Sequence, residues 1–253
     1  MEIIAIMSRK GGVGKTATAH ALGAGLMKRG YRVLFVDLDG QANLSYALKA
    51  TEDGNNSFHL LTHEAEAGEA IQHLEEGDII PGNEILQTAD KVIDDTGKEY
   101  RLKESLDPIR RKYDYIIIDT PAALGTVTIN ALVAANKVII PLKADAYSMQ
   151  GISRQMDIIT AVKKYCNPKL KIEGFLITQY KGRANLPQQF SNAIEELAKK
   201  EKTKLFKTRI RDCMPINEAA AFRTNIFDYA PGSNGAKDYD AFINEFLGED
   251  PKP

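Results

Sequence analysis

Short apolar runs alternate with segments of helical periodicity along most of the chain. The apolar runs span residues 2–7, 32–36, 115–118, 138–142, 172–178 and 205–210, and the helical patterns lie near residues 15–29, 125–135, 149–165, 185–200 and 235–247. Several runs are apolar at nearly every position, which is typical of parallel strands covered on both faces. The alternation predicts an α/β fold with a doubly wound, mostly parallel sheet flanked by helices.

The chain has 253 residues, a length that suits one large α/β domain, so we expect a single domain over residues 1–253. Residues 51–112 form the most polar and least periodic stretch. We expect short helices and loops there that decorate the same domain, with a short strand at residues 78–80. The tail, residues 248–253, is expected to be flexible.

Composition narrows the class of protein. Hydrophobic residues make up 43% of the chain and charged residues 26%, which is ordinary for a soluble globular protein. The net charge is -1, so any affinity for DNA must come from a local patch of cations. Cys166 and Cys213 are far apart and form no CxxC pair, which favours a reducing cytoplasm.

A glycine-rich stretch with the sequence KGGVGKT, residues 10–16, follows the first predicted strand and opens the first predicted helix. Its glycines allow backbone N–H groups to surround a polyphosphate, and the helix N-terminus adds a partial positive charge. Lys15 can reach the β- and γ-phosphates, and the Thr16 hydroxyl can ligate Mg²⁺. The predicted ATP-binding residues of this P-loop are Lys10, Gly11, Gly12, Val13, Gly14, Lys15, Thr16 and Ala17.

Carboxylates end two of the predicted strands. Asp37 and Asp39 follow the second strand, and Asp119 follows the strand at residues 115–118. Such carboxylates point at the ligand crevice of a parallel sheet, and beside a P-loop they are typical Mg²⁺ and catalytic groups. Asp37 and Asp39 alternate sides on an extended backbone, so they should have different roles. The metal site is predicted to comprise Thr16, Asp37 and Asp119.

The P-loop departs from the standard pattern in a way that indicates a family. Arg9 stands where a glycine is usual, and Lys10 is a second lysine. This is the deviant form of the motif, and the sequence resembles the ParA/Soj family within the ParA/MinD superfamily. The likeness extends over nearly the whole chain, and includes residues 80–83, 113–119, 128–132 and 218–219.

The resemblance implies the catalytic roles. Lys10 would cross a two-fold interface to the partner's phosphates, so that two ATP molecules are sandwiched in a homodimer. Lys15 would bind the phosphates, Asp39 would position the attacking water, and Asp37 would support the metal site. The cofactors implied are ATP and Mg²⁺. ATP is also favoured because Asn136-Lys137 lacks the aspartate of the guanine-reading NKxD motif.

The resemblance also implies a function. Family members are ATPases whose ATP-dependent dimerisation and non-specific binding to double-stranded DNA drive plasmid or chromosome partitioning, with hydrolysis stimulated by a ParB-like partner. The chain resembles the short Soj-like type without an N-terminal helix-turn-helix. A cytoplasmic, nucleoid-associated location follows as an expectation.

Some positions depart from the family pattern. Gly40 stands where proline is usual, and Ala17 where a second threonine is usual. The family segment that touches the adenine is Ile210-Arg211-Asp212-Cys213 here, which makes Arg211 and Cys213 the adenine-side candidates. The arginine that follows it in the family, linked to DNA binding, is replaced by Pro215.

Cations cluster near residues 199–211, where only Glu201 opposes them. A solvated helix end and edge strand would give the same pattern. As a DNA patch, this segment would be joined by arginines elsewhere in the chain. The DNA-binding candidates are Arg183, Lys204, Lys207, Arg209, Arg211 and Arg223.

Three alternatives compete with DNA partitioning. The same type of ATPase can position a protein cargo. A MinD-like membrane-positioning ATPase would need a basic amphipathic helix, whereas the polar face of residues 235–247 is acidic. We therefore expect that helix to pack on the protein's own core, with no membrane partner. A metal-cluster carrier would need partners for Cys166 and Cys213, and the sequence offers none.

Overall fold

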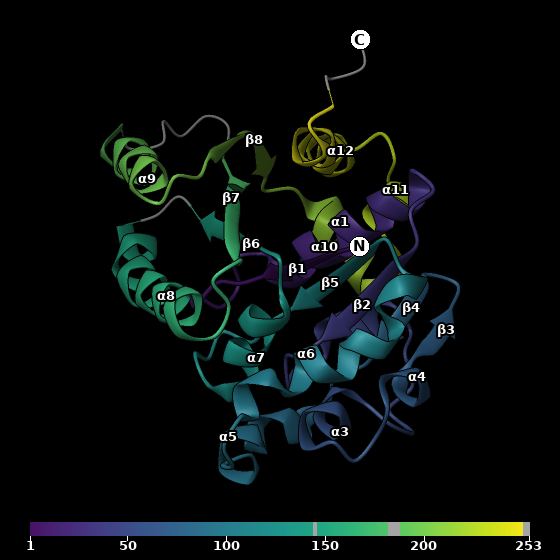
Figure 1. Cartoon of the computed structure of the whole chain (residues 1–253). Helices are drawn as coiled ribbons and strands as arrows, with labels where there is room; N and C mark the ends of the chain where they lie inside the picture. Colours follow the sequence, from purple (N-terminus) through teal and green to yellow (C-terminus); the bar gives the residue numbers. More distant parts are fainter. Residues whose placement is uncertain (144–145, 182–187, 250–253) are drawn as a thin grey trace.

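The computed structural model describes residues 1–143, 146–181 and 188–249 (Figure 1). The strands of this part of the chain are β1 (Glu2–Ile6), β2 (Val33–Asp37), β3 (Gln72–Leu74), β4 (Gly77–Ile80), β5 (Tyr115–Asp119), β6 (Lys137–Lys143), β7 (Lys171–Tyr180) and β8 (Leu205–Arg211). They form one sheet in the order β3-β4-β2-β5-β1-β6-β7-β8. Every neighbouring pair is parallel except β3 and β4. The predicted doubly wound α/β fold is confirmed.

Helices connect and cover the strands. The longer ones are α1 (Lys15–Lys28), α7 (Thr126–Ala134), α8 (Ala146–Tyr165), α9 (Gln188–Lys200), α10 (Met214–Ala221) and α12 (Asn234–Leu247). The shorter ones are α2 (Asn43–Ala47), α3 (Ser57–Thr62), α4 (Ala67–Ala70), α5 (Ala89–Val92), α6 (Arg101–Leu106) and α11 (Ile226–Tyr229), with 3-10 turns η1 (Glu84–Thr88), η2 (Lys98–Tyr100) and η3 (Asp107–Lys112). Five helices had been predicted, within three residues of their observed ends. Residues 185–187, predicted as the start of a helix, lie outside the described part.

The sheet separates two hydrophobic cores. One core packs α3, α6, α7, α8 and α9 against one face of the sheet. The other packs α1, α2, α11 and α12 against the opposite face, and Figure 1 shows α12 on the other side of the sheet from α8 and α9. Both faces of the central strands are therefore buried, which explains why β2 is buried at all five positions. Since one sheet runs through the described chain, we propose that it folds as a single domain.

Helix α1 lies unusually close to the sheet, which fixes the position of the P-loop at its start. A Cβ atom added at Gly23 would lie 2.1 Å from the ring of Phe35 on β2, so only glycine allows this approach. Gly14 ends the loop in the left-handed region, with φ of 82°, immediately before the helix. The P-loop is thus held against the carboxyl end of β1 by the packing of its own helix.

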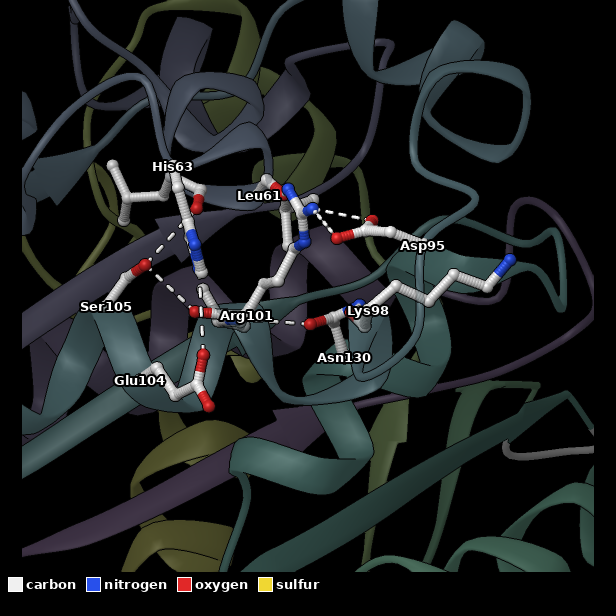
Figure 2. A network of polar contacts seen from close by, with 10 residues as sticks. Leu61, His63, Asp95, Lys98, Arg101, Glu104, Ser105 and Asn130 are labelled. Atoms are coloured by element: carbon white, nitrogen blue, oxygen red, sulfur yellow. Dashed lines mark hydrogen bonds and ion pairs between the residues drawn. The ribbon is translucent and has the colours of Figure 1, made fainter.

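The polar region at residues 51–112 is fixed to the sheet by buried side chains of the neighbouring elements (Figure 2). Asn130 of α7 is fully buried; its Oδ1 accepts from the N–H of Leu102, and its Nδ2 donates to the carbonyls of Lys98 and Thr126. Arg101 donates to the Leu61 carbonyl at the end of α3 at 2.8 Å. The expected decoration is therefore well ordered, and its antiparallel strand β3 was not predicted because it is only three residues long.

Helix α12 docks on the protein's own core, as its acidic polar face had indicated. Tyr239, Phe242 and Ile243 are buried in the second hydrophobic core. Glu245 accepts hydrogen bonds from the backbone N–H groups of Lys207 and Thr208 on β8, at 2.8 and 2.9 Å. Since β8 is the last strand of the sheet, this carboxylate satisfies donors that an edge strand would otherwise expose.

Replacing Asn130 with alanine should destabilise the fold strongly. The substitution leaves the N–H of Leu102 and the carbonyl of Lys98 without their partners and removes a second bond to the Thr126 carbonyl, which should lower the free energy of unfolding by about 3 kcal/mol. Urea unfolding followed by circular dichroism would measure the loss. Lys103→Ala, an exposed position on α6, is the matched control and should change stability by less than about 0.5 kcal/mol. Equal stability of the two variants would contradict the role assigned to Asn130.

Candidate functional site

The three strands that carry the predicted site are neighbours in the sheet. β5 lies between β2 and β1, and its last residue, Asp119, pairs in register with both Asp37 and Ile6. The loop after β1 leads into α1, so the glycine-rich loop and the two strand-end carboxylates converge at one edge of the sheet. The predicted convergence of Thr16, Asp37 and Asp119 is therefore present in the structure.

Asp119 faces the first residues of α1. The Thr16 hydroxyl donates a hydrogen bond to Asp119 Oδ2 at 2.6 Å. Asp119 is fully buried, and its other oxygen, Oδ1, has no hydrogen-bond partner among the described residues. A buried carboxylate oxygen without a partner is costly unless a ligand or water satisfies it. The pair of a hydroxyl and an open carboxylate oxygen fits Mg²⁺, which prefers such oxygen ligands.

Asp37 has a different environment, although it is equally buried. Its Oδ1 accepts from the backbone N–H of Asp39 at 3.0 Å. Its Oδ2 accepts from both the backbone N–H and the hydroxyl of Ser45, at 2.8 and 2.7 Å. Asp37 therefore anchors the loop that carries Asp39, and any support that it gives to a metal is indirect.

Burial raises the pKa of both carboxyls. The loss of hydration raises the pKa of Asp37 to about 6, against the opposing effect of the Ser45 hydrogen bonds. Burial likewise raises the pKa of Asp119 well above its usual range, and the nearby charge of Asp37 raises it further. A divalent cation bound here would favour the ionised form of both groups.

The glycine-rich loop is held by side chains from distant strands and helices. The Thr178 hydroxyl donates to the Val13 carbonyl at 2.7 Å, and Gln179 Nε2 donates to the Gly12 carbonyl at 2.5 Å. From α8, the buried Gln155 accepts from the backbone N–H of Arg9 and donates to the Met7 carbonyl. Gln155, Gln179 and Ser45 were not predicted as site residues. Gln155 and Gln179 contact the loop from 146 and 167 residues along the chain, which no local pattern marks, and the contact of Ser45 with Asp37 depends on the turn between them.

A cavity of about 920 Å³ lies next to this loop. One end is polar and contains Lys15, Thr16 and Asp39; Lys15 is only 7% exposed. The other residues that line the cavity come from the P-loop, α1, α2, η1, α5, α10, α11, α12, the end of β7, and the loops after β2, β5 and α10. They include Gly11, Gly12, Gly14, Ala17, His20, Ala21, Gly40, Gln41, Tyr46, Ala47, Gln87, Asp90, Ala122, Gly125, Ile216 and Ala220.

The predicted contacts on the adenine side are not among the described residues that line this cavity. Arg211 forms a paired contact with Asp238 of α12, with its Nε 2.9 Å from Oδ2 and its Nη2 2.6 Å from Oδ1. The structure thus assigns Arg211 to the junction of β8 and α12. Cys213 precedes α10 and lies against Gly235. Lys10 and Val13 also lie outside the cavity lining.

His20 is the most unusual polar group of the cavity. It lies one helical turn after Thr16 and packs edge-on against Phe35 with ring centroids 6.2 Å apart. Its Nε2 is buried and has no hydrogen-bond partner in the described structure. Burial lowers the pKa of His20 to about 4, so the side chain is neutral near pH 7. The sequence analysis did not select it.

The five DNA-binding candidates among the described residues have different surroundings. Lys207 and Arg209 are exposed on β8, and Arg209 stacks on the ring of Tyr180. Lys204 lies over the ring of Phe206, which is buried in the core that α1 and α12 form with the sheet. Lys204 also pairs with Glu173 at 3.4 Å.

The remaining candidates lie elsewhere. Arg223 donates to the Tyr46 carbonyl beside the cavity, and Arg211 is bound to Asp238. Arg183 lies outside the described residues. Lys204, Arg211 and Arg223 each contact a partner that the linear sequence does not reveal.

Two further findings concern membrane spans and clusters of metal-binding side chains. No helix among the described residues is long and apolar enough to cross a membrane. In the same part of the chain, no group of three or more histidine, cysteine, aspartate or glutamate side chains could hold a metal ion. A metal at Thr16 and Asp119 would therefore take its other ligands from water or from a bound phosphate.

The fold and the site together define a P-loop nucleotide-binding protein. A family model described as "AAA domain" matches residues 1–172. The sporulation initiation inhibitor protein Soj of Bacillus subtilis is 38% identical over 243 residues, which cover 94% of this chain and 95% of Soj. The chain belongs to the ParA/Soj family.

Solved structures agree with the fold. Cobyrinic acid a,c-diamide synthase from Mycobacterium smegmatis, with bound ATP analog and magnesium, has a TM-score of 0.84 and 29% sequence identity, and the match covers 98% of this chain and 94% of that one. A single-substitution variant of McdA from Cyanothece, in complex with ATP, has a TM-score of 0.87 at 24% identity, with 100% and 98% coverage. The second likeness supports the fold alone.

His20 predicts a measurable pH dependence of stability. The unfolded chain binds a proton at His20 below a pKa of about 6.5, whereas the folded protein does so only near pH 4. The stability that depends on His20 is therefore full above pH 6.5 and is lost as the pH falls towards 4, by about 3 kcal/mol. Urea unfolding of wild type and His20→Leu at about pH 7 and pH 4 would measure it.

Comparing wild type with His20→Leu isolates the contribution of His20 to the pH dependence of stability. Asp37, whose pKa is raised, acts in the opposite direction, but it is present in both proteins and cancels in the difference. The stability of the variant relative to wild type should rise by about 3 kcal/mol on acidification. An unchanged difference would mean that His20 is readily protonated in the folded protein.

Proposed function

We propose that this chain is a Mg²⁺-dependent ATPase that hydrolyses ATP to ADP and phosphate, and that it acts as a ParA-type partition motor. The observation that carries the proposal is the contact between the Thr16 hydroxyl and the buried Asp119 beside the phosphate loop. The open oxygen of Asp119 leaves a place for the metal at the edge of the cavity. Membership of the ParA/Soj family supports the same conclusion.

Each residue of the site has a role in this proposal. Backbone N–H groups of residues 11–15 bind the phosphate oxygens, and Lys15 adds its positive charge. Thr16 and Asp119 hold the Mg²⁺, which offsets charge on the phosphate oxygens. Asp37 fixes the loop that carries Asp39 through its bonds to Ser45 and the Asp39 N–H. Asp39 lines the cavity and orients the attacking water.

The proposed working form is a homodimer. Lys10 of each subunit reaches the phosphates bound by the other subunit, so that two ATP molecules lie between them. A lysine given across the interface offsets the repulsion of two polyanions. ATP thus drives dimerisation, and hydrolysis, stimulated by a ParB-like partner, reverses it. In this scheme the dimer acts in the cytoplasm on the nucleoid.

Asp39→Ala and Lys15→Ala form a matched pair that tests the ATPase assignment. Asp39→Ala should bind ATP and dimerise but turn over at least about 100-fold more slowly, because the attacking water loses its orienting group. Lys15→Ala should lose about 3 kcal/mol of ATP affinity, or about 100-fold, because the phosphates lose a buried cation. Calorimetry, phosphate release and light scattering measure these effects. Unchanged ATP binding by Lys15→Ala would refute the P-loop assignment.

For the cargo, we propose double-stranded DNA bound without sequence preference. Lys207 and Arg209 are the described cations best placed for phosphate contacts, since both are exposed on the edge strand β8. A dimer presents this pair twice, so ATP would raise the affinity for DNA by joining two weak patches. Arg183 would extend the contact.

The dispersal of the remaining candidate cations favours a second function, in which the same motor positions a protein cargo. Arg211 and Arg223 are held by partners within the chain, which leaves fewer cations for DNA than the sequence had indicated. A membrane cargo is less favoured, because the polar face of α12 contacts β8 through Glu245. The salt dependence of DNA binding separates the first two functions.

Gel retardation with a non-hydrolysable ATP analogue over a salt series tests the DNA assignment. Lys207→Ala combined with Arg209→Ala should remove about four phosphate contacts per dimer and lower the log–log salt slope by about 3.6. Lys204→Ala is the matched control, since Lys204 lies over Phe206 and pairs with Glu173. Retention of affinity and slope by the double variant would place the DNA contacts elsewhere. Absence of DNA binding by wild type under every nucleotide condition would favour the protein cargo.

A further inference from the structure

The segment formed by η1 and α5 touches two loops of the site at once. Leu86 and Ala89 are buried in the first hydrophobic core and anchor the segment. Gln87 and Asp90, each one residue further along, line the cavity with their polar side chains, and Leu86 also reaches it. Residues three apart share a face of a helical turn, so the segment presents these two polar side chains together to the site.

Asp90 contacts the loop that follows Asp119. Its Oδ1 accepts a hydrogen bond from the backbone N–H of Thr126, the first residue of α7, at 2.6 Å. A Cβ atom added at Gly125 would lie 2.1 Å from Asp90 Oδ2, so glycine is the residue that leaves room for this contact. A carboxylate at a helix N-terminus is also favoured by the helix dipole. Asp90 thereby fixes the far end of the loop that begins at Asp119.

Gln87 contacts the loop that carries Asp39. A Cβ atom added at Gly40 would lie 2.7 Å from Gln87 Cγ and 3.3 Å from its Nε2. The Gln87 side chain therefore lies directly against the backbone of the residue that follows Asp39. The other end of this loop is fixed by the bonds of Asp37 to Ser45. Asp39 is thus held from both sides.

We infer that Asp90 and Gln87 are positioning residues for hydrolysis: together they hold the loops that carry Asp39 and follow Asp119 at the spacing that the attacking water and the metal require. The inference rests on the proposed ATPase function. Both residues act through the backbone of the loops rather than on the nucleotide. Their loss should therefore lower turnover while leaving the ground-state binding of ATP nearly intact.

A double-mutant cycle at Asp90 and Gly125 tests the inference. The proteins are wild type, Asp90→Ala, Gly125→Ala and the double variant. Each is assayed for the affinity of a non-hydrolysable ATP analogue with Mg²⁺ by calorimetry, and for phosphate release at saturating ATP. Lys91→Ala, at the exposed neighbouring position, is the matched control and should behave as wild type. Thermal unfolding verifies that each variant is folded, and Asp90→Ser replaces Asp90→Ala if the latter is not.

The inference makes four expectations for this set. The analogue affinity stays within about threefold of wild type, whereas turnover falls at least about 10-fold in each single variant. The double variant is no slower than Asp90→Ala, because it lacks the carboxylate that the methyl group introduced by Gly125→Ala would strike. Asp90→Asn, whose amide oxygen can still accept from Thr126, recovers most of the turnover. Gln87→Ala shows the same separation of turnover from affinity.

Each opposite result has a definite meaning. Full turnover by Asp90→Ala, or a double variant in which the two losses multiply, overturns the inference, since Gly125 and Asp90 would then act independently. A loss of analogue affinity as large as the loss of turnover also overturns it, because the segment would then serve binding or folding. A wild type that binds ATP but never hydrolyses it, even with DNA and a ParB-like partner, overturns the proposed function and the inference with it.

Discussion

The burial of two carboxylates side by side at the ends of β2 and β5 is the constraint on which the site depends. Asp37 and Asp119 are both fully buried and pair in register across the sheet. Taking a carboxylate out of water is costly unless hydrogen bonds or cations replace the hydration. Here the partners are Ser45 and a backbone N–H for Asp37, and Thr16 for Asp119. The positions of α2, of the start of α1 and of the loop after β2 follow from satisfying these two groups.

The same constraint explains which parts of the site could be predicted from sequence. The glycine-rich loop and the strand-end carboxylates were predictable because each is a local pattern whose direction is set by its own strand or helix. Gln155 and Gln179 were not, because they reach the site only through the fold; Gln155 is 146 residues from the Arg9 N–H that it accepts from. Ser45 lies only eight residues after Asp37, but a serine in a turn has no pattern that marks it as the partner of a buried carboxylate.

The cations also could not be placed from the sequence alone. Here the sequence suggested a single surface, whereas the site side chains that were missed had shown no pattern at all. Their linear cluster near residues 199–211 looked like one surface, but Lys204 lies over Phe206, which belongs to the core on one face of the sheet, and pairs with Glu173. Arg211 is held by Asp238, which lies 27 residues further along. For the fold, the prediction was accurate for the long apolar and amphipathic segments. It missed α2, β3 and α11, which are too short to show a period.

The balance of charge at the polar end of the cavity limits how a nucleotide can bind there. Lys15 is a buried cation at this end, and its charge acts on Asp119, one of the two neighbouring carboxyls that burial already disfavours as anions. Two like charges about 4 Å apart repel by about 4 kcal/mol at an effective dielectric constant near 20. A polyphosphate bound without a metal would add repulsion of this size to the repulsion between the carboxylates of Asp37 and Asp119. We therefore expect the nucleotide to enter with Mg²⁺, since the cation lets Asp119 ionise and neutralises the phosphates in the same step.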